Sequence, residues 1–435
     1  MNLKQFITQH FLSTRLRELI LRIVGIFAIF CFMEAGGLYG YPIDGYPDTG
    51  IRRLERLRLR LAGQMQGALP MAGALKSTSS IILHLTENPI SSFDQVFVPD
   101  ALLQKRLDQL FPNRDESYSV ALLDITPGKP FRFASRQEDR LFPPGSVGKL
   151  AIAAGVFAEL ARIHPNSSSV RQALLRNRRI IADHWIHSDH HEVPIYDPQT
   201  RIFEFRQIRE GDEFSLYEWI DHMLSASANS AASTVWKEII LMRAFGQKYP
   251  PDRDEEKRFF KSTPRQQLQK LALSVVNDPL KESGIDSRHW QLGTFFTRSG
   301  KNIVPGAPSY ASPKGALQYL IRLEQGKIVD DWSSLEIKKL MYLTEKRIRY
   351  ASSPALSKAA VYFKSGSLYQ CKPEPGFRCL KYHGNVKNAM NSVAIVETAD
   401  GRVYLVSLMS DVLRKNSAVD HQTLATQIET IIKAP

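Results

Sequence analysis

The strongest constraint on the fold comes from residues 146–163, an Ala-rich stretch with almost no polar side chains. Pro143, Pro144 and Gly145 break the chain immediately before it and predict that a helix begins at Ser146. A helix that is apolar on all sides must be buried on all sides. The sequence therefore predicts a central helix that other elements surround, which requires a large domain.

Segments with the alternation and composition of β-strands lie on both sides of this helix. They are residues 117–125 and 131–134 before it and residues 360–368, 391–398 and 402–409 after it. A closing amphipathic helix is expected over residues 422–432. The predicted fold class is mixed α/β, in which an antiparallel sheet formed from both chain ends packs with a helical lobe.

The domain that carries these elements is predicted to span residues 95–435. Two charged insertions are expected within it, near residues 166–213 and 246–283. Residues 41–94 read as an N-terminal extension. Its cationic helix, over residues 52–60, either lies near a membrane surface or packs as a solvated helix on the main domain.

Residues 1–40 are expected to form a signal peptide or an N-terminal membrane anchor. Basic side chains precede the apolar run at residues 23–33, which is typical of an export signal. A buried helix of the domain is the alternative. We expect an exported protein of the periplasm or cell envelope, attached to the inner membrane if this segment is not cleaved.

The charge balance favours an anionic partner. The chain has 57 Lys and Arg against 44 Asp and Glu, a net charge of +13, which suits nucleic acid, anionic lipid or an anionic wall polymer. The basic residues are scattered and form no helix-turn-helix or aromatic-interleaved module. We therefore expect no nucleic-acid partner, and an anionic cell wall remains open.

Cys371 and Cys379 form an isolated pair on either side of a turn-rich segment with two prolines and a glycine. The spacing allows a disulfide, which requires an oxidising compartment and so agrees with export. Two free thiols are the alternative.

Three short motifs occur in order along the chain and carry the chemistry. They are Ser146-x-x-Lys149, Ser227-Ala-Asn229 and Lys364-Ser365-Gly366. Each is weak alone, but the ordered set, each in its expected structural setting, is a strong signal.

The first motif provides a nucleophile and its base. A serine hydroxyl needs a base to remove its proton, and the i, i+3 spacing places Ser146 and Lys149 on one helix face. Burial in an apolar helix favours the neutral, basic form of Lys149. The helix N-terminus favours negative charge on the attacking oxygen of Ser146.

The other two motifs provide proton relay and substrate binding. The Ser227 hydroxyl can pass a proton to the leaving group, and the Asn229 amide can bond both Lys149 and a substrate carbonyl. Lys364 offers positive charge for a substrate carboxylate. Ser365 keeps a hydroxyl beside it, and Gly366 leaves room for the substrate backbone. The backbone N–H of Ser367, with that of Ser146, is expected to form an oxyanion hole.

With these residues the chain resembles the class A serine β-lactamases and the related DD-peptidases over residues 95–433. The resemblance implies acyl-enzyme chemistry on a β-lactam or on a D-alanyl-D-alanine-like amide, without a cofactor. A DD-carboxypeptidase or transpeptidase of the cell wall is the alternative enzyme. A non-hydrolytic penicillin-binding sensor is an alternative of a different class.

The chain departs from the family pattern at three positions. Ala228 stands where the family usually has Asp, and Ser365 replaces Thr. The third position is in the loop that carries the deacylating glutamate of class A enzymes, where the best match places Gln291. An amide can orient a water but cannot deprotonate it, so we expect slow deacylation, with Asp286 as the first substitute base.

A cluster of histidines lies in the first insertion, at His184, His187, His190 and His191. If residues 184–191 were helical, three of these would share one face and could bind a metal. Short His-rich inserts are more often surface segments. We expect no metal and leave the role of the cluster open.

Overall fold

The computed structural model describes residues 43–67, 76–87, 92–344 and 347–434. The predicted signal peptide or anchor at residues 1–40 lies outside the described residues.

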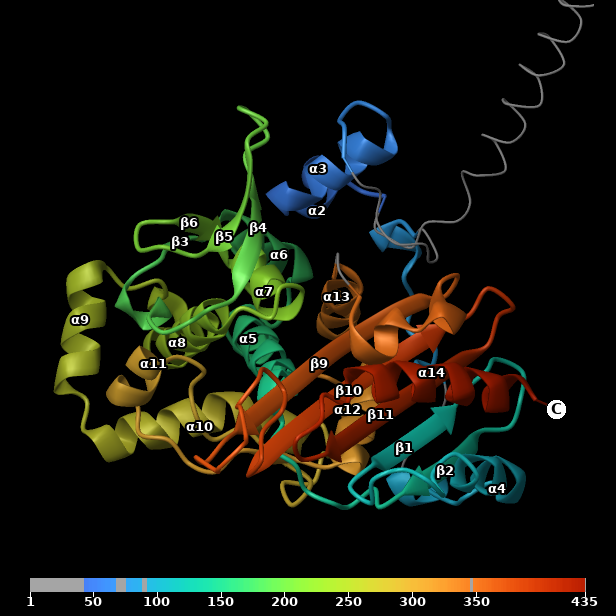
Figure 1. Cartoon of the computed structure of the whole chain (residues 1–435). Helices are drawn as coiled ribbons and strands as arrows, with labels where there is room; N and C mark the ends of the chain where they lie inside the picture. Colours follow the sequence, from blue (N-terminus) through green and yellow to red (C-terminus); the bar gives the residue numbers. More distant parts are fainter. Residues whose placement is uncertain (1–42, 68–75, 88–91, 345–346, 435) are drawn as a thin grey trace, which may run out of the picture. The chain divides into compact units, whose positions relative to one another are not determined.

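The central element is a five-stranded antiparallel sheet with the strand order β2-β1-β11-β10-β9 (Figure 1). Its strands are β1 (Ser119–Asp124), β2 (Arg132–Arg136), β9 (Ala360–Gln370), β10 (Lys387–Glu397) and β11 (Val403–Asp411). β1 pairs with β11, so that Leu122 lies opposite Val406. The predicted mixed α/β class with an antiparallel sheet is confirmed. The edge strand β9 borders the helical lobe, and it carries the Lys364 motif.

Both faces of the sheet are buried, because alternate residues of one strand enter different cores. In β1, Ala121 and Leu123 belong to the larger core, whereas Val120 and Leu122 belong to a second core. The second core is closed by α4 (Ala101–Asp108) and α14 (Ala418–Lys433). α12 (Pro313–Glu324) covers the other face.

The apolar helix is α5 (Lys149–Ile163), and most of its residues are fully buried. It is surrounded by α7 (Leu216–Leu224), α8 (Asn229–Phe245), α10 (Arg265–Glu282) and α13 (Asp331–Tyr342). α10 approaches so closely that a Cβ at Gly155 would lie 2.5 Å from the Val275 carbonyl oxygen. The sequence predicted a helix from Ser146, but a 3-10 turn (Gly145–Gly148) comes first and the α-helix begins at Lys149.

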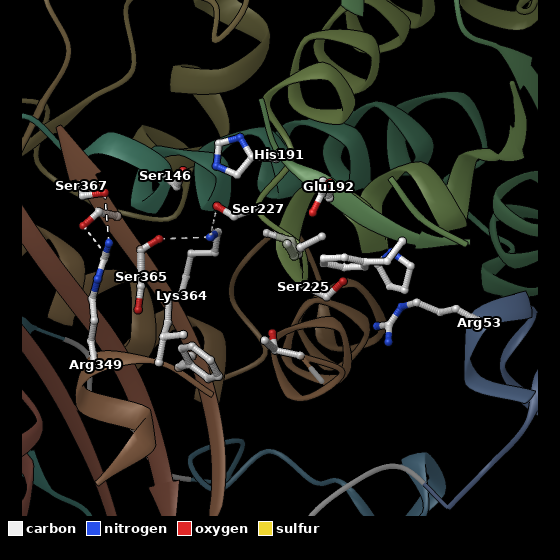
Figure 2. Close-up of a pocket in the computed structure, with 18 of the residues that line it drawn as sticks. Arg53, Ser146, His191, Glu192, Ser225, Ser227, Arg349, Lys364, Ser365 and Ser367 are labelled. Carbon is white, nitrogen blue, oxygen red and sulfur yellow. Dashed lines mark hydrogen bonds between the residues drawn. The ribbon is translucent and has the colours of Figure 1, made fainter. Parts of the chain in front are cut away.

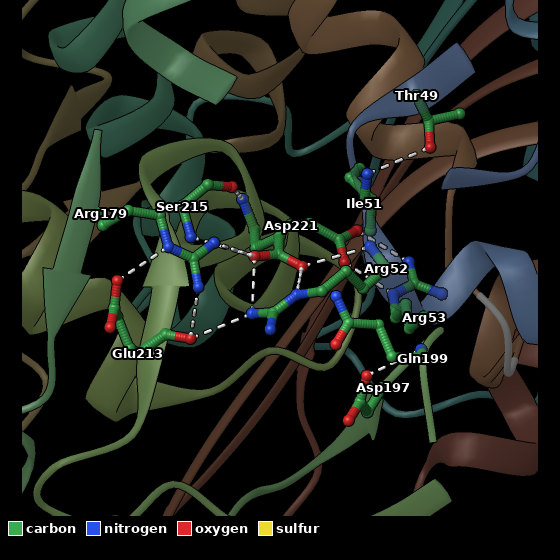
Figure 3. A network of polar contacts seen from close by, with 11 residues as sticks. Thr49, Ile51, Arg52, Arg53, Arg179, Asp197, Gln199, Glu213, Ser215 and Asp221 are labelled. Atoms are coloured by element: carbon green, nitrogen blue, oxygen red, sulfur yellow. Dashed lines mark hydrogen bonds and ion pairs between the residues drawn. The ribbon is translucent and has the colours of Figure 1, made fainter. Parts of the chain in front are cut away.

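The N-terminal segment packs on the helical lobe. It contains α2 (Tyr46–Thr49) and α3 (Arg52–Leu61), and Leu54 and Leu57 of α3 enter the larger core. Arg53 forms a buried bidentate ion pair with Asp221 of α7, at 2.6 and 2.7 Å (Figure 3). The sequence left two arrangements open for this cationic helix, and in the structure it packs on the domain. It is not a solvated helix, because about half of its side chains are buried.

The first insertion contains α6 (Ser168–Asn177) and two small two-stranded sheets. One pairs β3 (Arg179–Ile181) with β6 (Glu213–Ser215), and the other is the hairpin of β4 (Glu192–Tyr196) with β5 (Phe203–Gln207). The second contains α9 (Arg253–Ser262), which has no buried residue, and then α10 of the core. The remaining short elements are α11 (Arg298–Ile303), β7 (Trp290–Gln291) and β8 (Tyr310–Ala311). Among the described residues, no helix combines the length and apolar character needed to cross a membrane.

Candidate active site

The turn that carries Ser146 is pressed against strand β9, and two glycines make this possible. A Cβ at Gly366 would lie 2.3 Å from the Pro144 carbonyl oxygen and 2.9 Å from Ser146 N. Gly145 has a positive φ of 52°, and a Cβ there would lie 2.7 Å from Ser367 N. Only glycine fits at both places. The close approach brings the backbone of the serine turn next to the backbone of residues 366–367.

Lys149 is fully buried, and its Nζ has three polar neighbours. These are Ser146 Oγ at 3.0 Å, the Ser227 carbonyl oxygen at 2.6 Å and Asn229 Oδ1 at 2.8 Å. Burial lowers the pKa of Lys149 to about 7, and the charge of Asp189 opposes this shift. A neutral amine has two N–H donors and one lone pair. It can therefore donate to the two carbonyl oxygens and accept the Ser146 hydroxyl proton, which is the arrangement of a general base.

Ser227 connects this pair to the third motif. It has a positive φ of 60°, which is uncommon for a residue with a side chain, and it precedes α8. Its Oγ accepts a hydrogen bond of 2.8 Å from Lys364 Nζ. Burial lowers the pKa of Lys364, and the positive charges of Lys149 and Arg349 lower it further. A bound carboxylate would offset these effects and hold Lys364 in its charged form.

Arg349 is a site residue that sequence analysis missed. Its guanidinium donates to the Gly366 carbonyl oxygen at 2.7 Å and to Ser367 Oγ at 3.0 Å, so it fixes the segment of β9 beside Ser146. Asn391 of β10 was also missed. Its amide donates to the carbonyl oxygens of Pro143 and Pro144, at 2.8 and 3.1 Å. No local motif marks either residue, since both act on segments distant in the sequence.

These groups line a pocket of about 510 Å³, whose labelled residues are shown in Figure 2. The pocket is bordered by one carboxylate, that of Glu192, and by five basic side chains, of which Arg53 is already paired with Asp221; the other four are Arg56, Arg349, Lys364 and Lys381. A second part of the wall is apolar and consists of Pro194, Phe203, Phe205, Leu224, Ile348 and Phe363. The hydroxyl of Ser365 is buried in the wall and has no hydrogen-bond partner among the described residues. The pocket suits an anionic ligand with an apolar substituent.

The structure does not bring Gln291 into this pocket. Its side chain donates to the Pro308 carbonyl oxygen at 2.9 Å and accepts from the Tyr310 hydroxyl at 3.3 Å. Asp286, the expected substitute base, is bound at 2.6 Å by Arg288, which lowers the pKa of this carboxyl to about 2. Neither side chain is among those that line the pocket.

Leu292 and Phe296, which follow Gln291 in the chain, pack against the turn that joins Ser146 to Lys149. Asn277 fixes Leu292 by bonds to its backbone N–H and carbonyl, at 2.9 and 2.8 Å. A Cβ at Gly148 would lie 2.9 Å from Leu292 Cδ1, and the Phe296 ring centroid lies 4.7 Å from Lys149 Nζ. The loop therefore presents apolar side chains to the pair.

The histidine cluster does not share a helix face. Residues His184–Ile186 form a single 3-10 turn, and Ser188 has a positive φ of 74° that interrupts any helix. His187 is half-exposed and pairs with Glu210 at 2.6 Å. Of the four histidines only His191 lines the pocket. Within the described parts of the chain, no group of three or more His, Cys, Asp or Glu side chains is placed to hold a metal ion.

Cys371 and Cys379 form a disulfide in the loop between β9 and β10, with a Cα–Cα distance of 6.1 Å. Lys381 and Tyr382, which lie in the same loop after Cys379, line the pocket.

The chain is similar to known proteins of one family. The family model described as the beta-lactamase enzyme family matches residues 102–432, whereas comparison with curated proteins gave no match. Similar solved structures include the TLA-3 extended-spectrum β-lactamase, with 12% identity, a TM-score of 0.50 and coverage of 76% of this chain and 96% of that chain. A β-lactamase from Chitinophaga pinensis DSM 2588 has 15% identity, a TM-score of 0.49 and coverage of 76% and 97%. PBP-A has 13% identity, a TM-score of 0.48 and coverage of 77% and 96%. At such identities a structural likeness concerns the fold alone. Because the family model spans most of the sequence, the chain belongs to the beta-lactamase enzyme family and is a serine hydrolase of the β-lactamase type.

Proposed function

We propose that this enzyme cleaves the amide bond of an anionic β-lactam or of a related D-alanyl peptide through an acyl-enzyme on Ser146. The observation that carries the proposal is the contact of Lys149 Nζ with Ser146 Oγ, at 3.0 Å, in a fully buried setting. A lysine that burial keeps neutral can act as a base, and the serine hydroxyl is within its reach.

In the acylation step the Ser146 hydroxyl proton moves to Lys149 Nζ while Oγ bonds to the substrate carbonyl carbon. The backbone N–H groups of Ser146 and Ser367 stabilise the negative oxygen that develops. The carbon–nitrogen bond then breaks, and the leaving nitrogen takes a proton through the Ser227 hydroxyl. The proton removed from Ser146 thus ends on the leaving group, and Lys149 is neutral again.

We infer that the substrate is anionic, because basic side chains line the pocket. A substrate carboxylate beside β9 would contact Lys364 Nζ and accept from Ser365 Oγ, a buried hydroxyl without a partner among the described residues. Leaving such a hydroxyl unbonded costs about 1–3 kcal/mol, which a bound carboxylate would recover. The apolar wall near Phe203 and Phe205 would take an aryl or alkyl substituent on the acyl side.

Deacylation is proposed to be the slow step. The side of the Ser146–Lys149 pair that faces the Gln291 loop carries Leu292 and Phe296, neither of which can accept a proton. General-base catalysis contributes about 10²–10⁴-fold to a hydrolytic step. Because this side of the pair holds no carboxylate, deacylation should be slower than acylation, and β-lactams should give a burst followed by slow turnover.

The same features support a second candidate, a DD-carboxypeptidase or transpeptidase of the cell wall, because a long-lived acyl-enzyme suits transfer to another acceptor. Release of terminal D-alanine from a pentapeptide, compared with hydrolysis of nitrocefin, discriminates the two. A stable acyl-enzyme that yields no product from either substrate would point to a penicillin-binding sensor.

The decisive experiment is labelling with a fluorescent penicillin. We expect the wild-type enzyme to be labelled and Ser146→Ala to remain unlabelled. Ser168→Ala is the matched control, since Ser168 is exposed on α6 and does not line the pocket. Failure of the wild-type enzyme to react at high probe concentration would remove penicillin recognition.

Export to the periplasm or cell envelope remains part of the proposal. It is supported by the basic and apolar pattern of residues 1–40 and by the disulfide between Cys371 and Cys379. Intact-mass measurement of the protein purified from the cell envelope, with and without reductant, tests it. Two free thiols before reduction would contradict it.

A further inference from the structure

An aspartate and a histidine of the first insertion meet at the pocket. His191 Nδ1 lies 2.6 Å from Asp189 Oδ1. The other oxygen, Asp189 Oδ2, accepts from the backbone N–H and the hydroxyl of Ser230, at 2.8 and 2.9 Å. Ser230 lies in the first turn of α8, next to Asn229. The pair is therefore attached to the helix that forms part of the active site.

The hydrogen bond to Asp189 decides which ring nitrogen of His191 is free. Nδ1 carries the proton that it donates to the carboxylate, so Nε2 holds a lone pair. Nε2 has no hydrogen-bond partner among the described residues, and His191 lines the same pocket as Ser146 and Ser227. Figure 2 draws the ring together with Ser146 and Ser227 among the residues that line this pocket. A ring with this tautomer and position can accept a proton from a molecule in the pocket.

Asp189 is ionised, and its negative charge acts on Lys149. Burial opposes its ionisation, but the hydrogen bonds from His191 and Ser230 outweigh burial and hold the pKa of the carboxyl well below its usual range. The same carboxylate raises the pKa of Lys149 against the effect of burial. Asp189 is thus close enough to act electrostatically on the base that activates Ser146.

We propose that His191 is the base of the deacylation step and that Asp189 is its positioning residue; this inference rests on the proposed acyl-enzyme function. A water gives one proton to His191 Nε2, and its oxygen bonds to the acyl carbon. The bond between that carbon and Ser146 Oγ then breaks, and Oγ takes the proton from the imidazolium. The step consumes one water and returns both side chains to their starting forms.

Glu192 carries the one carboxylate that lines the pocket, and it could also accept a proton. It is exposed, and no side-chain hydrogen bond or ion pair within the described ranges fixes its carboxylate. His191 is fixed at Nδ1 and is only partly exposed, with 40% of its side chain accessible. A general base must be oriented toward its water, so the structure favours the histidine.

The test separates acylation from deacylation. The full-length enzyme is reacted with penicillin, excess penicillin is removed, and the decay of the acyl-enzyme is followed by intact mass. We expect His191→Gln to form the acyl-enzyme as the wild type does but to lose it about 10²-fold more slowly, the low end of the range for a general base. His190→Gln is the matched control, because His190 is the exposed neighbour and does not line the pocket. Decay of the His191→Gln acyl-enzyme at the wild-type rate would overturn the inference.

A second measurement distinguishes catalysis from a structural role. Imidazole added to the acyl-enzyme of His191→Ala should restore the decay, because the cavity left at the pocket wall admits the missing ring. Slow decay that imidazole does not change would mean that His191 only maintains the local structure, and the inference would fall. A wild-type enzyme that never forms an acyl-enzyme would instead refute the proposed function itself.

Discussion

The buried lysine makes a quantitative prediction for the pH dependence of acylation. Burial lowers the pKa of Lys149 to about 7, so the amine is neutral above this pH and protonated below it. Only the neutral form can take the Ser146 proton. The acylation rate constant should therefore be constant above about pH 8 and fall tenfold per unit well below the pKa, to about 1% of its maximum at pH 5.

The size of the pKa shift shows why the neutral form of Lys149 dominates above pH 7. From the ordinary value of 10.5 to about 7, the shift corresponds to about 5 kcal/mol against the charged form. It also affects stability. Between pH 7 and 10.5 the unfolded state binds the Lys149 proton and the folded state does not, so the contribution of this residue to the unfolding free energy rises with pH in that window.

Rapid-quench labelling with a fluorescent penicillin between pH 5 and 9 measures the acylation rate constant as a function of pH. Because His191 is a second base at the pocket, the same profile is measured for His191→Gln, which should show the same fall in rate at low pH. A profile that is flat between pH 5 and 8, or one with its midpoint near 10, would refute the assignment of Lys149 as the base. If the fall in rate at low pH disappeared in His191→Gln, that fall would be assigned to the imidazole of His191. Lys149→Arg should not acylate at any pH, since a guanidinium stays protonated.

Three further predictions follow from individual contacts. Asp221→Ala leaves the buried charge of Arg53 without its main partner and should lower the unfolding free energy by about 3–5 kcal/mol in urea titrations; a loss below about 1 kcal/mol would show that the pair is not buried in solution. Gly366→Ala forces a Cβ to 2.3 Å from a backbone oxygen, so penicillin labelling should slow by about 10²–10³-fold, as for loss of an oxyanion-hole donor, and an unchanged rate would show that β9 lies farther from the serine turn. Leu292→Glu places a carboxylate next to Gly148, between Ser146 and Lys149 in the chain, and should speed decay of the acyl-enzyme at a cost in Tm, whereas Gln291→Glu should leave that decay unchanged; a faster decay in Gln291→Glu would show that its side chain reaches the site.

The site residues that the sequence predicts best are those whose chemistry and local structure coincide. The contact between Ser146 and Lys149 follows from their spacing at a helix start, and the burial of the following helix from its composition. The position of Gln291 was harder to predict, because the conformation of its loop depends on Asn277 of the preceding helix α10, which holds the backbone of Leu292. A one-residue difference in such a loop decides which side chain faces the nucleophile. No spacing between residues in the sequence indicates which side chain this is.

The substitution of Ala228 shows how a missing residue can be replaced from elsewhere in the chain. The resemblance leads one to expect an aspartate at this position, and the residue before α8 indeed makes no side-chain cap. A helix start without a capping oxygen leaves backbone N–H groups unbonded. Here the carboxylate of Asp189, which the first insertion supplies, accepts from Ser230 N at 2.8 Å. The insertion thus supplies a carboxylate that the motif lacks, and with its second oxygen that carboxylate holds His191 at the pocket. The departure of the motif and the added histidine are therefore best understood as one arrangement.

Asp189→Asn should accordingly weaken the start of α8, which lowers the Tm, and should also slow the decay of the acyl-enzyme. A variant that changed only the Tm would separate the cap from the chemistry.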